Sequence, residues 1–153
     1  MARRVRTALA VGVAVVCVAG VTAAPSDSDL EVVRLDPAAA PPGGRTVVHA
    51  FVANRGPEQT ASPFAVVVRL PSGFTAEGPY FPEGCRAEAG GRLVRCTFGP
   101  GLARLRTATA LVPVRVDAAV PPGAKAGGHL QVVSVDDRDP RNDRTGFTLS
   151  VDC

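Results

Sequence analysis

The chain has 153 residues, which is enough for one ordinary domain and too few for two. Its formal net charge of +3 resides in the first few residues, because three of the 17 Lys and Arg residues are Arg3, Arg4 and Arg6. Beyond residue 23 the chain carries 14 basic and 14 acidic residues, so the basic pI near 8.9 belongs to the leader. Charge therefore argues against a nucleic-acid partner for the remainder.

Residues 1–23 have the organisation of a secretory signal peptide. A basic start is followed by an uncharged run of small apolar residues, and then by the polar stretch Ser26–Asp29. We expect a signal-peptide helix cleaved after Ala23, a short linker over 24–28 and one domain over 29–153. The alternative is an uncleaved membrane anchor, since about 18 mildly apolar residues can just span a bilayer. The domain is expected to be secreted or on the cell surface, and to meet a membrane only through an uncleaved leader.

Apolar residues in the rest of the chain recur with a period of two, which indicates strands. The expected strands are Asp29–Leu35, Arg45–Asn54, Phe64–Leu70, Cys85–Glu88, Leu93–Phe98, Thr107–Asp117, His129–Val135 and Asp143–Val151. In the second of these, Val48, Ala50 and Val52 share one face, and His49 lies on the other. Seven or eight short strands separated by turn residues predict an all-β sandwich.

Three features between these strands carry further expectations. The stretch Phe74–Gly84 is predicted to be a long connection, and Gly127-Gly128 to lie in a loop. Pro113 lies inside a predicted strand but has no N–H to donate, which suggests an edge strand or a bulge.

Several segments together resemble a known family. In chain order they are Asp29–Val32, Gly44–Pro57, Leu70–Phe74, the cysteines Cys85 and Cys96, Gly123 before Gly127, and Asp139–Asn142. This sequence of turn motifs resembles the bacterial domain of unknown function 11, and the related bacterial cell-adhesion domain has a similar layout. The resemblance covers about residues 29–151. It implies an immunoglobulin-like Greek-key sandwich found in exported and cell-surface proteins, with no catalytic residues.

The cysteines Cys85 and Cys96 are placed symmetrically about Gly90-Gly91. A hairpin with that turn sets the two residues opposite each other, within reach of a disulfide. The same register sets Arg86 opposite Arg95, a like-charge pair that costs some stability. We expect the disulfide in spite of this cost, because an exported protein can keep one.

Cys153 has no such partner in the sequence. It could be a free thiol, a relic of truncation, or a bridge that links two copies of the chain. A disulfide-linked dimer through Cys153 is therefore one possible assembly.

An oxygen-rich loop could hold calcium. Its candidate ligands are Asp136, Asp137, Asp139, Asn142 and Asp143. Arg138, Arg141 and Arg144 interleave with them and would neutralise such a site, and the spacing does not fit an EF-hand. We therefore expect a solvated interstrand loop, with no metal and no cofactor bound by the chain.

The two histidines, His49 and His129, have no nucleophile motif beside them, so no catalytic site is expected and the protein is predicted not to be an enzyme. The connection between the third and fourth predicted strands is rich in aromatic residues. Phe74, Tyr80 and Phe81 could form an exposed binding loop, or they could cap one end of the core.

The function expected from these features is an exported, non-catalytic structural, adhesive or protein-binding module at the bacterial envelope or outside it. The alternative is a secreted carbohydrate-binding accessory that uses the aromatic loop. The partner is accordingly an unidentified protein or an envelope glycan.

Overall fold

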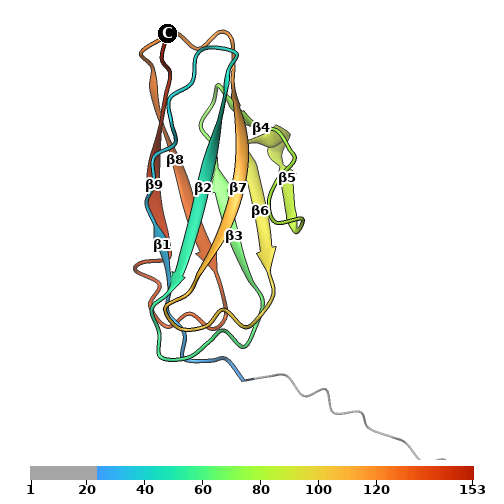
Figure 1. Ribbon diagram of the computed structural model, residues 1–153, viewed down its shortest axis with the longest axis vertical. Helices are drawn as coiled ribbons and strands as arrows, with labels where there is room; N and C mark the ends of the chain where they lie inside the picture. Colours follow the sequence, from blue (N-terminus) through green and yellow to red (C-terminus); the bar gives the residue numbers. More distant parts are fainter. Residues whose placement is uncertain (1–23) are drawn as a thin grey trace, which may run out of the picture.

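Two antiparallel sheets pack face to face in a sandwich whose strands run along the long axis of the molecule (Figure 1). The computed structural model describes residues 24–153. One sheet has the order β1-β2-β7-β4 and the other β5-β6-β3-β8-β9. The strands are β1 (Leu30–Val33), β2 (Arg45–Asn54), β3 (Phe64–Arg69), β4 (Phe74–Ala76), β5 (Cys85–Glu88), β6 (Leu93–Phe98), β7 (Thr107–Val116), β8 (Lys125–Val133) and β9 (Arg144–Ser150), with a single 3-10 turn, η1 (Ala89–Gly91), between β5 and β6.

The core lies between the inner faces of the two sheets. Val48, Ala50 and Val52 of β2 are fully buried, as their alternation predicts, and small and branched side chains occupy the matching positions of β7. Phe64, Phe74 and Phe147 supply the largest buried rings. The all-β, immunoglobulin-like sandwich predicted from the sequence is confirmed, with nine strands over residues 24–153 instead of seven or eight.

The two additional stretches of strand arise where the sequence shows turn residues. The predicted connection after Leu70 contains β4, whose three residues pair with the end of β7. Strand β8 begins at Lys125, four residues before the predicted start, and includes Gly127 and Gly128. The reason is packing, because a side chain at Gly128 would collide with the ring of Phe147. Glycine there makes room for an aromatic residue of the core and does not mark a loop.

Pro113 lies in a central strand, because β7 pairs with β2 on one side and β4 on the other. It sits just beyond the end of β4, where the Glu77 N–H donates to the Pro113 carbonyl oxygen at 3.0 Å. The chain then leaves β7 and returns at Phe81, which bridges to Leu111. The missing N–H of Pro113 therefore faces a gap in the pairing, so the sheet has a local edge inside a central strand.

The residues expected to form a linker are hydrogen-bonded to the domain from Ser26 onward. The Ser26 N–H donates to the Asp136 carboxylate at 3.0 Å, and Ser28 is fully buried. Within 24–153 no helix has the length and apolar character to cross a bilayer. The predicted signal-peptide helix lies outside the described residues.

Candidate interaction surfaces

The three aromatic residues of the predicted binding loop lie in three different environments. Phe74 is 2% exposed in the core, and Tyr80 is partly buried against the core. Burial, and then the negative charge of Glu77, raises the pKa of Tyr80. Phe81 is 57% exposed. Phe74 is therefore not available at the surface, and a sugar-stacking loop made of all three rings does not form.

Phe81 extends the four-stranded sheet. Its N–H donates to the Leu111 carbonyl at 3.1 Å, and its own carbonyl accepts from the Leu111 N–H at 2.8 Å. Paired residues project to the same side of a sheet, so Phe81 stands beside Leu111 on the outer face. Leu111 in turn pairs with His49 of β2, whose neighbours Val48 and Ala50 point into the core. An apolar row thus crosses the sheet from its Phe81 edge.

The row ends in a hollow at the opposite edge, where Leu35 follows β1. Leu35 is 43% exposed and lines a hollow of about 440 Å³ together with Val47 and His49. The rings of His49 and Phe51 lie 6.0 Å apart between their centroids. We call this surface the apolar face. It consists of Val33, Leu35, Val47, His49, Phe51, Phe81, Thr109, Leu111 and Pro113.

The edges of the sheets are partly covered by the chain itself. At β9 the Thr148 N–H donates to the Asp36 carboxylate at 2.7 Å, and the Ser150 carbonyl accepts from the Ala40 N–H. This Thr148 N–H, and to a smaller extent Arg34, lowers the pKa of Asp36. At β1 the Val32 N–H donates to a loop carbonyl. These contacts leave few free backbone groups for an added strand at β1 and β9, so faces are better candidates for docking than these edges.

A polar cluster closes the end of the sandwich where the described chain begins. Asn54, at the end of β2, is fully buried, and its side-chain amide forms four hydrogen bonds. Its oxygen accepts from the N–H groups of Asp29 and Gly56, and its nitrogen donates to the carbonyls of Glu58 and Leu102. This residue ties three loops together, a role that no local sequence signal reveals.

The loop that was expected to be solvated is anchored by a buried carboxylate. Asp136 is 2% exposed and accepts hydrogen bonds from the N–H groups of Ser26, Ala61 and Ser62. The prediction of a simple solvated loop was wrong at this residue, because its partners come from segments about 75 and 110 positions away. Within residues 24–153, no three His, Cys, Asp or Glu side chains are placed to hold a metal ion.

Two further carboxyl groups of this loop differ in acidity. Burial, then a hydrogen bond with Asp137 and the negative charges of Asp137, Asp139 and Asp29, raises the pKa of Asp143 to about 7. Hydrogen bonds from Arg141 lower the pKa of Asp139 to about 2. Near neutral pH the carboxyl group of Asp143 therefore keeps part of its proton.

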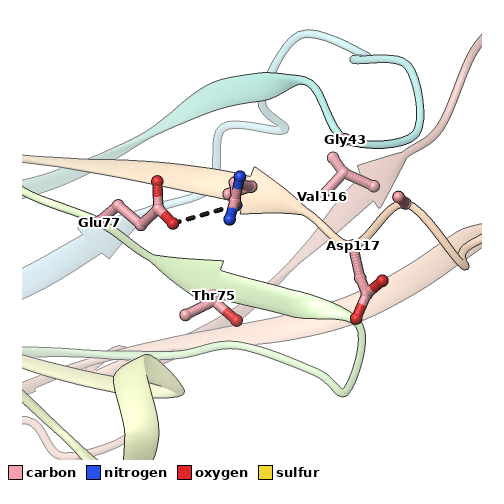
Figure 2. Close-up of a pocket in the computed structure, with 7 residues that line it drawn as sticks. Gly43, Thr75, Glu77, Val116 and Asp117 are labelled. Atoms are coloured by element: carbon pink, nitrogen blue, oxygen red, sulfur yellow. Dashed lines mark ion pairs between the residues drawn. The ribbon is translucent and has the colours of Figure 1, made fainter.

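A hollow of about 330 Å³ lies beside β4 at the end of β7, and Figure 2 shows its lining. The Glu77 carboxylate lies between two guanidinium groups, 2.9 Å from Arg45 and 3.0 Å from Arg115. Glu77 and Arg115 therefore satisfy each other's charge. The other charged group of the lining, Asp117, accepts a hydrogen bond from the Ala119 N–H.

The histidines lie on opposite sides of the sandwich. His49 belongs to the outer face of the four-stranded sheet, and His129 to the outer face of the five-stranded sheet. The fold therefore does not bring the two imidazoles into one site.

The predicted disulfide is present, with Cys85 and Cys96 paired in register and an S–S distance of 2.07 Å. The same register sets Arg86 opposite Arg95, as expected. Cys153 is exposed and has no disulfide partner in the described chain.

No protein-family model and no curated protein matches the chain, so the resemblance to the bacterial domain of unknown function 11 is supported only at the level of the fold. A chain of the complex between a CaDoc0917 variant and CaCohA2 is similar, with a TM-score of 0.53, 10% identity, and coverage of 80% of this chain and 99% of that one. A variant of BcpA, the major pilin subunit of Bacillus cereus, is similar with a TM-score of 0.51 and 12% identity. That match covers 82% of this chain and only 39% of the pilin. At such identities the likeness establishes the immunoglobulin-like fold alone.

Proposed function

We propose that this domain is an exported, non-catalytic structural or adhesive module that docks through its apolar face, and that a second copy of the chain occupies that face. The observation that carries the proposal is the pairing of a knob and a hollow on one surface. Phe81 projects at one edge of the four-stranded sheet, and the hollow beside Leu35 and His49 lies at the other edge.

This arrangement is self-complementary under a two-fold axis. The order across the face is Leu35, His49, Leu111 and Phe81, with β2 and β7 in the middle. An axis that runs parallel to the strands, midway between β2 and β7, places the Phe81 edge of one copy over the Leu35 edge of the other. The contact then occurs twice, as a symmetric dimer interface requires.

The size of the face suits a modest interface. With strands ~4.8 Å apart and a rise of ~3.3 Å per residue, the ten-residue strands β2 and β7 and the shorter β1 and β4 together cover about 430 Å². Specific interfaces bury about 800 Å² per partner, so this face suits a weak, reversible contact. A buried aromatic anchor commonly dominates such contacts, and Phe81 fits that role.

Two observations support an extracytoplasmic, assembling protein. The disulfide between Cys85 and Cys96 suits an oxidising compartment, as does the leader predicted over residues 1–23. Two of the similar folds belong to a two-protein complex and to a major pilin subunit, which are both settings of protein assembly.

Sedimentation equilibrium of the mature domain carrying Cys153→Ser tests the proposal without interference from the exposed thiol. We expect a reversible monomer–dimer equilibrium that Phe81→Ala weakens at least about tenfold, which is roughly 1.4 kcal/mol. The matched control is Leu105→Ala, which truncates another side chain that is 66% exposed, in the loop before β7 and outside the residues of the apolar face. The control should dimerise normally, and both variants should unfold at similar temperatures.

A protein that stays monomeric up to about 1 mM would overturn self-docking, because affinity that weak is not specific assembly. So would a dimer that is unaffected by Phe81→Ala in a folded protein, since the contact must then lie on another surface.

A further inference from the structure

The outer face of the five-stranded sheet carries a line of arginines. Cross-strand pairing aligns Arg86 of β5, Arg95 of β6, Val67 of β3, Gln131 of β8 and Arg144 of β9 in one row. The next row holds Glu88, Leu93, Arg69 and His129 in register. We call this surface the basic face. It consists of Arg69, Arg86, Arg95, His129, Gln131 and Arg144.

The arginines of this face differ from the others in their partners. Six arginines of the described chain form ion pairs with carboxylates, and all lie elsewhere: Arg34, Arg45, Arg55, Arg115, Arg138 and Arg141. Within residues 24–153 none of the four arginines of the basic face forms such a pair. Arg86 donates only to the carbonyls of Glu83 and Cys85, which leaves its charge uncompensated.

The alignment of Arg86 with Arg95 is unfavourable for the isolated domain, because like charges directly opposite in a sheet repel. All four arginines are exposed. A row of exposed, unpaired guanidinium groups is matched by a ligand that brings several negative charges in a line. Guanidinium groups bind sulfate, phosphate and carboxylate through paired hydrogen bonds.

We propose that the basic face binds a linear anionic polysaccharide lying across the strands. The row spans four strand spacings from β5 to β9, or about 19 Å, which is the length of several sugar residues. Val67, only 4% exposed, closes the floor of the row, and Gln131 adds a side-chain amide that can bind sugar hydroxyls.

The composition of the face favours a polysaccharide over a nucleic acid or a membrane. All seven aromatic residues lie in the core, against it, or on the apolar face, so none can stack on bases here. The face carries no aromatic side chain, and the leucine beside it, Leu93, is only partly exposed, which does not suit a protein held in a bilayer interface. This site is independent of the proposed dimer, because the two sheets turn their outer faces in opposite directions.

Fluorescence anisotropy with labelled dextran sulfate, with neutral dextran of equal length as the comparison, tests the assignment on the mature domain. We expect binding to dextran sulfate alone, weakening as salt rises from about 50 to 200 mM through counterion release. Arg95→Gln combined with Arg144→Gln should weaken binding about tenfold or more, and should make the salt dependence shallower by about two counterions. Arg34→Gln combined with Arg55→Gln removes the same charge elsewhere and should change affinity less than about twofold.

Equal losses in the two double variants would overturn the site, since binding would then follow net charge. Absence of binding at low salt would also overturn it. Tighter binding of single-stranded DNA or of phosphatidylglycerol vesicles at equal salt would overturn the choice of a polysaccharide. Phe81→Ala should bind dextran sulfate normally, so failure of the dimer and failure of this site are distinguishable.

Discussion

The two outer faces of the sandwich are built by the same alternation but have opposite chemistry. On the four-stranded sheet the outward positions of β2 and β7 include Val47, Phe51 and Leu111. On the five-stranded sheet the corresponding positions are held by Arg95 and Arg144. The inward positions of both sheets are alike, since nearly all of them carry apolar side chains. The core therefore accounts for the fold, and the difference in function resides in the residues that the core does not use.

The comparison also shows that net charge does not report how charges are distributed over the surface. The described chain has equal numbers of basic and acidic residues, yet its arginines divide into a paired set and an unpaired set. A neutral domain can therefore present a basic surface. The sequence argument against polyanion binding considered only the sum of the charges, whereas binding depends on their distribution.

Removing the disulfide should have the largest effect on stability. It should also affect the basic face, because the disulfide holds β5 in that face. Replacing Cys85 and Cys96 by Ser should lower the free energy of unfolding by about 3 kcal/mol, since the bridge closes a loop with a sequence separation of 11. Denaturant unfolding at fixed pH measures this. If the faces are independent, the folded variant should lose affinity for dextran sulfate as β5 and Arg86 loosen, and should keep its dimer. A parallel loss of both would show that the faces are coupled.

A charge placed on the apolar face should block dimerisation through it. Leu111→Arg puts a guanidinium group in the middle of the proposed interface, where it would be buried without a partner. We expect dimerisation to weaken more than about 100-fold, or roughly 2.7 kcal/mol. Thr97→Arg, on the outer side of β6, is the matched control and should leave the sedimentation profile unchanged. A Leu111→Arg protein that is folded and still dimeric would exclude the apolar face as the interface.

Some features of the two faces could be predicted from the sequence, and others could not. The register of Cys85 with Cys96 could be predicted because a two-glycine turn relates them locally, and the outward position of His49 followed from alternation. Both faces depend on pairings between distant strands. Phe81 joins the apolar face through Leu111, thirty residues later, and Arg144 reaches the row of Arg95 only across β3 and β8. No periodicity within one segment contains that information.

The polar end should respond to pH without affecting either face. An Asp has a pKa near 3.8 when unfolded, and Asp143 has a pKa of about 7 in the fold, so between these values the folded state binds the extra proton. The contribution of Asp143 is complete below about pH 4 and is lost as the pH rises through 7. Because the Asp143 side chain is only partly buried and solvent screens its interactions, we expect less than about 1 kcal/mol.

Asp143→Asn should remove this part of the pH dependence, because an amide stays neutral and can still donate to Asp137. The variant should be more stable than the parent at about pH 8, by thermal unfolding across the pH range, with unchanged binding at both faces. Asp139 acts in the opposite direction, but only at lower pH, because its pKa lies near 2. An unaltered stability profile between pH 4 and 8 would show that Asp143 is ionised throughout.

The smallest expected effect is the loss of folding stability caused by the like charges of the basic face. Arg95→Gln removes the repulsion with Arg86 while keeping most of the side chain next to Val67, and no hydrogen bond or ion pair of Arg95 is lost in the described chain. We expect the free energy of unfolding to rise by about 0.5 kcal/mol at low salt, with less gain at high salt. Arg69→Gln is the control, because Arg69 lies opposite Leu93 and His129 and not opposite another arginine.

A variant that is more stable and yet binds dextran sulfate less tightly would show that Arg95 is retained for binding, at the expense of stability. If Arg95→Gln is instead no more stable than Arg69→Gln, the pairing with Arg86 costs the fold nothing, and the like-charge alignment no longer supports a ligand on this face.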